Sequence, residues 1–233
     1  MTKKINSKLT KLINYYSLIN YNLIFKNQTI NRYRNNNHIG QGNKESNLKK
    51  LQTTIRNIKN CELKKNANNL VFSDGNPNSK IMIIGEGPGA DEDNEGFPFV
   101  GRTGQLLDKM LLSINLDRKN VYITNVLNYR APENRRPTDE EVKKYSPYLF
   151  KHIEIISPKI LILLGSTALN TVLGGEDVIS KVRGRWIEKK IGNNKVNIIA
   201  SFHPAFLMRQ PAQKKLAWID LKMIKDKKLQ LKI

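Results

Sequence analysis

Lys80–Gly89 reads KIMIIGEGPG, an apolar run that ends abruptly in a glycine-rich turn. Three more short apolar runs follow it, at Val121–Thr124 (VYIT), Ile160–Leu164 (ILILL) and Val196–Ala200 (VNIIA). None shows the alternation of apolar and polar residues that marks a strand with one face in water. We therefore expect strands that are buried on both faces, as in a parallel sheet.

Segments with helical periodicity separate these runs, and they are Thr103–Ile114, Asp139–Ile156, Ser166–Leu173 and Ala212–Lys228. Thr138 or Asp139, followed by Glu141, gives the second segment an N-terminal cap. Alternating strands and helices predict an α/β fold, a three-layer α/β/α sandwich around a four-stranded, largely parallel sheet. Arg185–Ile191 fits a hairpin strand before the fourth run.

The first part of the chain differs in composition from the rest. Residues 1–66 are rich in Asn and Lys and hold 14 basic and 2 acidic residues, within a net charge of +20 for all 233 residues. We expect a basic, partly helical N-terminal extension over 1–66, with helices near Leu9–Ile19 and Asn47–Ile58, and a catalytic domain over 67–233. The charge favours a polyanionic partner, most simply nucleic acid, although an AT-rich genome would also enrich Lys and Asn.

Cys61 is the only cysteine, so the chain has no internal disulfide and no thiolate cluster of its own. No apolar run approaches the roughly 18 residues that a membrane span needs. We expect a monomeric cytoplasmic protein that does not associate with membranes.

A polar residue or a glycine turn follows each apolar run. Glu86, Asn125, Ser166 and His203 stand just beyond the four predicted strands. Because ligands bind outside the carboxyl ends of parallel strands, we expect these four residues to meet at one edge of the sheet.

Three stretches resemble the motifs of family 4 uracil-DNA glycosylases in their order. They are GEGPGADEDNEGFPFVGRTGQLLDKML (Gly85–Leu111), ITNVLNYRAPENRRPT (Ile123–Thr138) and FHPAFLMR (Phe202–Arg209), and the resemblance runs from about Cys61 to Trp218. It implies a DNA glycosylase that flips uracil out of DNA and hydrolyses its N-glycosidic bond, as in base excision repair. The motifs hold no lysine suited to Schiff-base chemistry, so we expect an abasic site without strand cleavage.

The resemblance also assigns roles within the site. It implies that Phe99 stacks on the flipped base, that Asn125 reads the base edge and that His203 stabilises charge on uracil O2. Gly87 stands where better-known glycosylases place a water-activating aspartate. The water is then positioned by Glu86, by Glu92 in the following loop or by backbone groups, and of these we favour Glu86 with Glu92 as its competitor.

Contacts to DNA are expected after the histidine and in the loops at the same edge. Leu207 or Met208 would act as the wedge between base steps, and Arg209 would contact a phosphate. Further phosphate candidates are Arg102, Arg130, Arg135 and Arg136.

The chain departs from the family at the cysteines that usually hold a [4Fe–4S] cluster. Ile58, Cys61, Tyr129 and Tyr145 stand at the four ligand positions. One cysteine cannot hold such a cluster, so we expect no metal and no cofactor.

Two other functions stay open at this point. One is a non-catalytic DNA-binding relative of the same fold that serves replication machinery. The other is a glycosylase for another deaminated base, such as hypoxanthine or xanthine.

Overall fold

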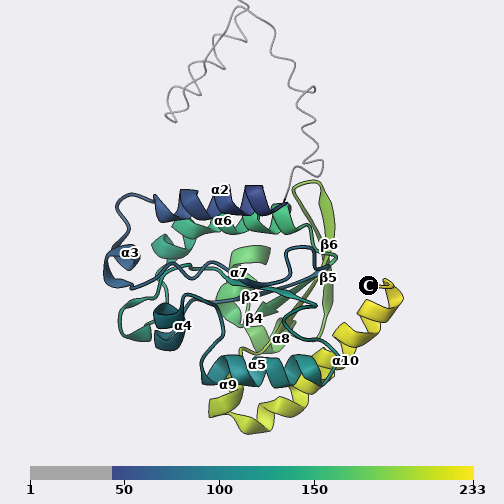
Figure 1. Ribbon diagram of the computed structural model, residues 1–233. Coiled ribbons are helices and arrows are strands. Elements are labelled where there is room, and N and C mark those ends of the chain that lie inside the picture. The colour runs from purple at the N-terminus through teal and green to yellow at the C-terminus, as the bar shows by residue number, and fades with distance from the viewer. Residues whose placement is uncertain (1–43) are drawn as a thin grey trace, which may run out of the picture. The chain divides into compact units, whose positions relative to one another are not determined.

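A computed structural model describes residues 44–233, which form one α/β unit around a six-stranded sheet (Figure 1). The strands are β1 (Asp74–Gly75), β2 (Ile81–Gly85), β3 (Tyr122–Asn125), β4 (Ile160–Leu164), β5 (Trp186–Ile191) and β6 (Asn194–Ser201). Their order is β1-β3-β2-β4-β6-β5, and the middle four are parallel. The four predicted parallel strands are therefore confirmed. β1 and β5 add an antiparallel strand at each edge, β5 as the hairpin partner of β6.

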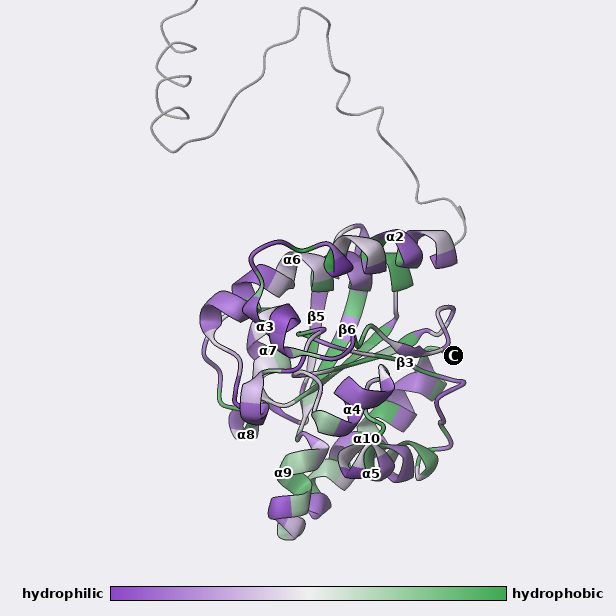
Figure 2. Cartoon of the chain, turned by 60° about the vertical axis from the view of Figure 1, so that its left-hand side comes forward, coloured by the Kyte–Doolittle hydropathy of each residue, from purple (hydrophilic) through white to green (hydrophobic). Residues whose placement is uncertain are grey.

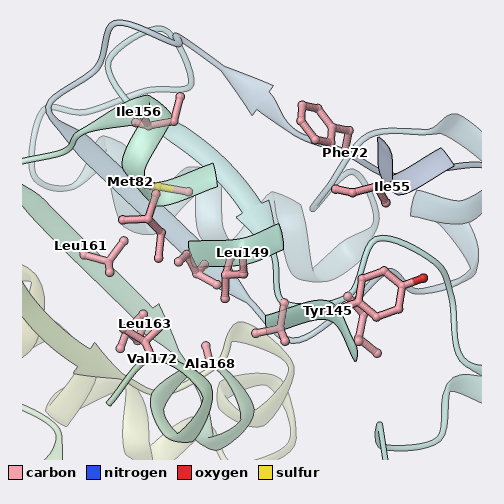
Figure 3. Packing of buried hydrophobic residues seen from close by; sticks show 14 of the residues in the cluster. Ile55, Phe72, Met82, Tyr145, Leu149, Ile156, Leu161, Leu163, Ala168 and Val172 are labelled. Carbon is pink, nitrogen blue, oxygen red and sulfur yellow. The ribbon is translucent and has the colours of Figure 1, made fainter. Parts of the chain in front are cut away.

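Alternate residues of the strands face opposite layers of helices. Met82 and Leu161 point into a core shared with α2 (Lys44–Arg56), α6 (Asp139–Ile156) and α7 (Ser166–Leu173). Figure 3 shows side chains of this core, contributed by strands and helices together. The strands have apolar residues on both faces because both faces are covered by helices.

The second layer lies on the opposite face of the sheet (Figure 1). It consists of α5 (Arg102–Leu112), α9 (Pro204–Arg209) and α10 (Lys214–Gln230), which pack over Ile83 and Ile162. Figure 2 shows hydrophobic residues concentrated on the central strands and hydrophilic residues on the outer helices. The sheet therefore lies between two helical layers, as the predicted three-layer sandwich requires.

Short elements join these layers. They are α3 (Glu62–Asn66), α4 (Ala90–Glu95), α8 (Ile179–Val182) and the 3₁₀ turns η1 (Pro132–Asn134) and η2 (Pro211–Gln213). α6 and α7 have the predicted bounds, and Thr138 caps α6 by accepting a hydrogen bond from the backbone N–H of Glu141 at 3.2 Å. Within residues 44–233, no helix combines the length and the apolar character that a membrane crossing requires.

The boundary that we expected after residue 66 does not separate the helices before it from the sheet. Leu48, Leu51 and Ile55 of α2 and Leu63 of α3 are buried in the core that also holds α6. The compact unit therefore includes α2 and α3, because an amphipathic helix is stabilised by packing of its apolar face. The helix predicted near Leu9–Ile19 lies outside the described residues.

Candidate active site

The carboxyl ends of the parallel strands open into a cleft of about 690 Å³. Glu86, Asn125, Ser166 and His203 all line it, as their positions after the strands predict. The cleft is also lined by residues 87–89, Phe99, Thr103 and Thr167, and by Arg135, Arg136 and Arg209 on its rim.

Asn125 ends β3 at the floor of this cleft. Its side chain is 3% exposed, and its Oδ1 atom is buried with no hydrogen-bond partner among the described residues. A buried acceptor without a partner carries a desolvation cost of about 1–3 kcal/mol. Gly85 lies beside it, at the end of β2, where a Cβ would come within 2.4 Å of Oδ1. The site thus keeps a buried acceptor for which residues 44–233 supply no donor.

Phe99 lies next to Asn125 with an unusual backbone. Its φ of 56° is in the left-handed region, which costs energy for a residue with a side chain. Its carbonyl accepts a hydrogen bond from Arg118 and lies so close to Gly104 that any Cβ there would overlap it. These contacts hold the ring beside His203, with 5.5 Å between the ring centroids.

Arg118 was not among the predicted site residues, although it fixes the loop that carries Phe99. Its guanidinium pairs with Asp74 at 2.5 Å and with Asp108 at 2.9 Å, and it also donates to the carbonyl of Pro98 at 3.2 Å. These partners come from β1, α5 and the loop between α4 and α5, so only the folded chain assembles them.

His203 precedes α9 as its N-terminal cap. Its Nδ1 accepts a hydrogen bond from the backbone N–H of Ala205 at 3.2 Å, so the ring proton is on Nε2. Burial, together with the positive charge of Arg209, lowers the pKa of His203 to about 4 from an ordinary value of 6.5. At neutral pH the ring is therefore uncharged and can donate one hydrogen bond from Nε2.

Glu86 follows β2 and is only partly buried in the cleft. Its Oε2 accepts a hydrogen bond from the hydroxyl of Thr167, the second residue of α7. Its Oε1 accepts no hydrogen bond from residues 44–233, so this carboxylate can hold a water molecule. Gly87 follows it along the wall of the cleft, where a Cβ would make ordinary contact with Leu127 at 3.4 Å. Thr167 was missed from the sequence because only its hydrogen bond to Glu86 distinguishes it.

Glu92 has a different environment. Its two oxygens accept hydrogen bonds from the backbone N–H groups of Gly89 and Gly101, at 3.0 and 3.1 Å. This pairing closes the loop around α4 and leads the chain into α5. Of the two carboxylates that compete for the water, Glu92 is the one already occupied by the backbone.

The comparisons with known proteins agree with this geometry. Residues 72–222 match the model of the uracil DNA glycosylase superfamily. This chain belongs to that superfamily. It is 40% identical to a type-4 uracil-DNA glycosylase of Archaeoglobus fulgidus, over 76% of this chain and 92% of that protein. It is 45% identical to a type-4 uracil-DNA glycosylase of Thermotoga maritima, over 64% of this chain and 77% of that protein.

The two residues predicted to act as a wedge, Leu207 and Met208, differ in their exposure to solvent. Leu207 is 1% exposed and packs in the core under α5 and α10, so it is not free to enter DNA. Met208 is 37% exposed and Arg209 is exposed on the rim of the cleft. Of the two wedge candidates only Met208 reaches the solvent, because the helical turn of α9 points these two neighbours in different directions.

The predicted phosphate contacts differ in their availability. Arg135 lines the cleft but pairs with both oxygens of Glu141, at 2.7 and 2.8 Å, and this pairing lowers the pKa of the Glu141 carboxyl. Arg136 lines the same rim and is exposed. Arg130 donates to Asn134 at 2.8 Å, and Arg102 is exposed at the start of α5, both beyond the cleft lining.

The four positions that the sequence resemblance assigns to iron–sulfur ligands lie in the core around α6. Ile58, Cys61, Tyr129 and Tyr145 are all buried, and the Cys61 thiol lies 3.2 Å from the Tyr145 hydroxyl. One thiol, two phenols and an aliphatic side chain do not fit a cluster that needs four thiolates. Within residues 44–233, no group of three His, Cys, Asp or Glu residues is placed to hold a metal ion.

Proposed function

We propose that this protein removes uracil from DNA, flipping the base into the cleft and hydrolysing its N-glycosidic bond to leave an abasic site. The observation that carries the proposal is the unpaired, buried Oδ1 of Asn125 beside the ring of Phe99. A base that stacks on Phe99 would present its edge to that amide. The names of the type-4 relatives support the same activity.

The Asn125 amide selects uracil by its hydrogen-bonding pattern. Uracil presents an N3–H donor and an O4 acceptor, which match Oδ1 and the NH₂ group of the amide. Cytosine presents an acceptor and a donor at the same places, so it would leave both amide groups mismatched. Leaving a buried acceptor unpaired is costly, and this cost gives discrimination between the two bases.

His203 would act on the leaving group. As the C1′–N1 bond breaks, its electron pair moves onto the pyrimidine and the sugar takes on oxocarbenium character. A neutral imidazole that donates from Nε2 to O2 stabilises the anion where the charge develops. A pKa of about 4 keeps the ring neutral, and a neutral imidazole is too weak an acid to transfer its Nε2 proton, so it acts as a hydrogen-bond donor.

Glu86 would direct the second half of the reaction. Its carboxylate, oriented by Thr167, holds a water molecule that attacks C1′. The carboxylate then accepts the proton that the water loses. The products are uracil, which is reprotonated from solvent, and a sugar with a hydroxyl at C1′. The negative charge of the Glu86 carboxylate also stabilises the positive sugar during bond cleavage.

Contacts outside the base pocket hold the DNA. Met208 would part the stack, and Arg209, Arg136 and Arg135 would contact phosphates along the rim. The reaction uses no metal or cofactor in this proposal, because each chemical role falls to a side chain of the cleft.

The decisive experiment incubates the purified protein with duplex and single-stranded oligonucleotides that carry one uracil, and then cleaves abasic sites with alkali. His203→Ala and Asn125→Ala should each lower the single-turnover rate by about a hundredfold or more, with little change in binding to undamaged DNA. No cleavage by wild-type protein would support the non-catalytic alternative. Cleavage only at hypoxanthine or xanthine would assign the site to another base.

A further inference from the structure

A buried ion pair, whose two residues do not line the cleft, joins α10 to the end of α8. Asp220 of α10 is 0% exposed, and its carboxylate pairs with the guanidinium of Arg183, which is 10% exposed. The Nε of Arg183 donates to Asp220 Oδ2 at 3.0 Å. Gly184 leaves room for this carboxylate, since a Cβ there would lie 3.0 Å from Oδ1 and its φ is +68°.

The same two charges contact the residues that lead into His203. The hydroxyl of Ser201, at the end of β6, donates to Asp220 Oδ2 at 2.7 Å. Arg183 lies over the ring of Phe202, 5.4 Å from its centroid. Ser201 and Phe202 are the two residues immediately before His203, so the ion pair contacts both residues that lead into the imidazole.

The pair also fixes the elements on either side of α9. Arg183 donates to the carbonyl of Leu216 in the first turn of α10, at 2.5 Å. Phe202 in turn packs on Phe206 of α9, with ring centroids 4.8 Å apart. The start of α10, the end of β6 and α9 are thus tied to one buried charge pair, while His203 itself contacts neither member.

We propose that Arg183 and Asp220 are positioning residues for His203, holding the end of β6 so that the Nε2–H points at the base. This inference rests on the proposed role of His203 in uracil excision. Neither residue touches the substrate, and no sequence motif singles them out.

Energetics argue that stability alone does not explain the pair. Removing two charges from water costs several kcal/mol per ion, and apolar residues of similar volume often stabilise a protein as well or better. Burial opposes ionisation here and raises the pKa of Asp220, while Ser201 and Arg183 favour its charged form. What an apolar pair cannot supply is the directed set of hydrogen bonds to Ser201 and Leu216.

This difference provides the test. Arg183→Met alone leaves a buried carboxylate unpaired, and we expect a large fall in melting temperature. In the double variant Arg183→Met/Asp220→Asn both charges are gone, and the melting temperature should recover most of that loss. The single-turnover rate of uracil excision at saturating enzyme should remain at least tenfold below wild type. Ser201→Ala, which removes one link without changing any charge, should lower the rate in the same direction.

The matched control removes the ion pair at the far end of the same hairpin. Lys195 and Glu188, 2.6 Å apart, join β6 and β5 on an exposed surface. The double variant Lys195→Met/Glu188→Gln should excise uracil at the wild-type rate. A double variant at Arg183 and Asp220 that is as fast as this control would overturn the proposal.

A spectroscopic readout separates positioning from the failure of the proposed function. The ring-nitrogen NMR signals of His203 are assigned by their absence from the spectrum of His203→Ala. In the wild-type protein without DNA, their chemical shifts should show the Nε2–H tautomer. In Arg183→Met/Asp220→Asn and in Ser201→Ala the signal should move toward a mixture of tautomers, as the hydrogen bond from Ala205 weakens. An unchanged tautomer in both variants would overturn the inference. Failure of the wild-type protein to excise uracil would instead overturn the proposed function.

Discussion

Gly85→Ala tests the proposed base pocket by adding a single methyl group to its wall. A Cβ at Gly85 would lie 2.4 Å from Asn125 Oδ1 and 2.5 Å from Phe99 Cζ, whereas ordinary contacts begin at 3.4 Å. One methyl group would therefore press on both the residue proposed to read the base and the ring proposed to stack on it. Relief of the overlap requires displacements of about 1 Å.

A displacement of that size is large for a preorganised site. Misplacement by about 1 Å can cost a hundredfold in rate, which corresponds to roughly 2.7 kcal/mol of barrier. Overpacking a close-packed interior also costs stability, typically about 1–3 kcal/mol. We therefore expect a single-turnover excision rate about a hundredfold below wild type and a moderate fall in melting temperature.

The assay compares Gly85→Ala with Ile55→Val under single-turnover conditions at a temperature well below both melting points. Ile55 is buried on α2, and its truncation costs about 0.5–1.5 kcal/mol without reaching the cleft. Ile55→Val should retain the wild-type rate. If Gly85→Ala also retained it while remaining folded, Asn125 and Phe99 would not form the base pocket.

Three other outcomes are expected. Anaerobically purified protein should be colourless and fully active, and stoichiometric iron and sulfide in it would contradict the expected absence of a cluster. Burial lowers the pKa of His203 to about 4 and that of His152 to about 3. As the pH drops, both histidines are protonated in the unfolded chain at a higher pH than in the folded protein. The free energy of unfolding should therefore fall between about pH 6.5 and 4, by roughly 3 kcal/mol for each histidine. Denaturant titrations that show no such fall in wild type, or the same fall in His152→Gln, would refute this. Deleting residues 1–43, which carry seven basic and no acidic residues, should lower the salt slope of DNA binding by up to about 6 and leave excision intact. An unchanged slope with a lower melting temperature would mean that this segment packs on the domain.

The parallel sheet could be predicted from the sequence because two separate signals identify each of its strands. Each is a short apolar run buried on both faces, and each ends in a glycine turn or a polar residue. β1 has two residues and no apolar run, so its antiparallel pairing with β3 depends on the fold. The boundary at residue 66 followed composition, whereas α2 joins the core through Leu48, Leu51 and Ile55, spaced along one helical face.

The predicted site residues differ from the missed ones in where their partners lie. Asn125 and His203 follow directly from their places at strand ends. Arg118 and Thr167 act through contacts with residues distant in sequence, such as Phe99, 19 positions from Arg118, and Glu86, 81 positions from Thr167. Leu207 was ambiguous because a one-residue step around α9 separates a core position from an exposed one. Periodicity over six residues is too short to decide which neighbour faces the solvent.

The four positions that the sequence resemblance assigns to cluster ligands show which contacts order the loop carrying Asn125 in this chain. Tyr129 follows that residue by four positions, and Tyr145 lies on α6, so their burial ties the loop to the helix layer. Burial raises the pKa of both phenols, which therefore stay neutral at any physiological pH. Each buried aromatic side chain contributes roughly 2–3 kcal/mol, and the contact between the Tyr145 hydroxyl and the Cys61 thiol satisfies the polar atom inside the core. Two such side chains supply several kcal/mol of cohesion at the place where a metal cluster would cross-link the chain, and they do so without any thiol beyond Cys61.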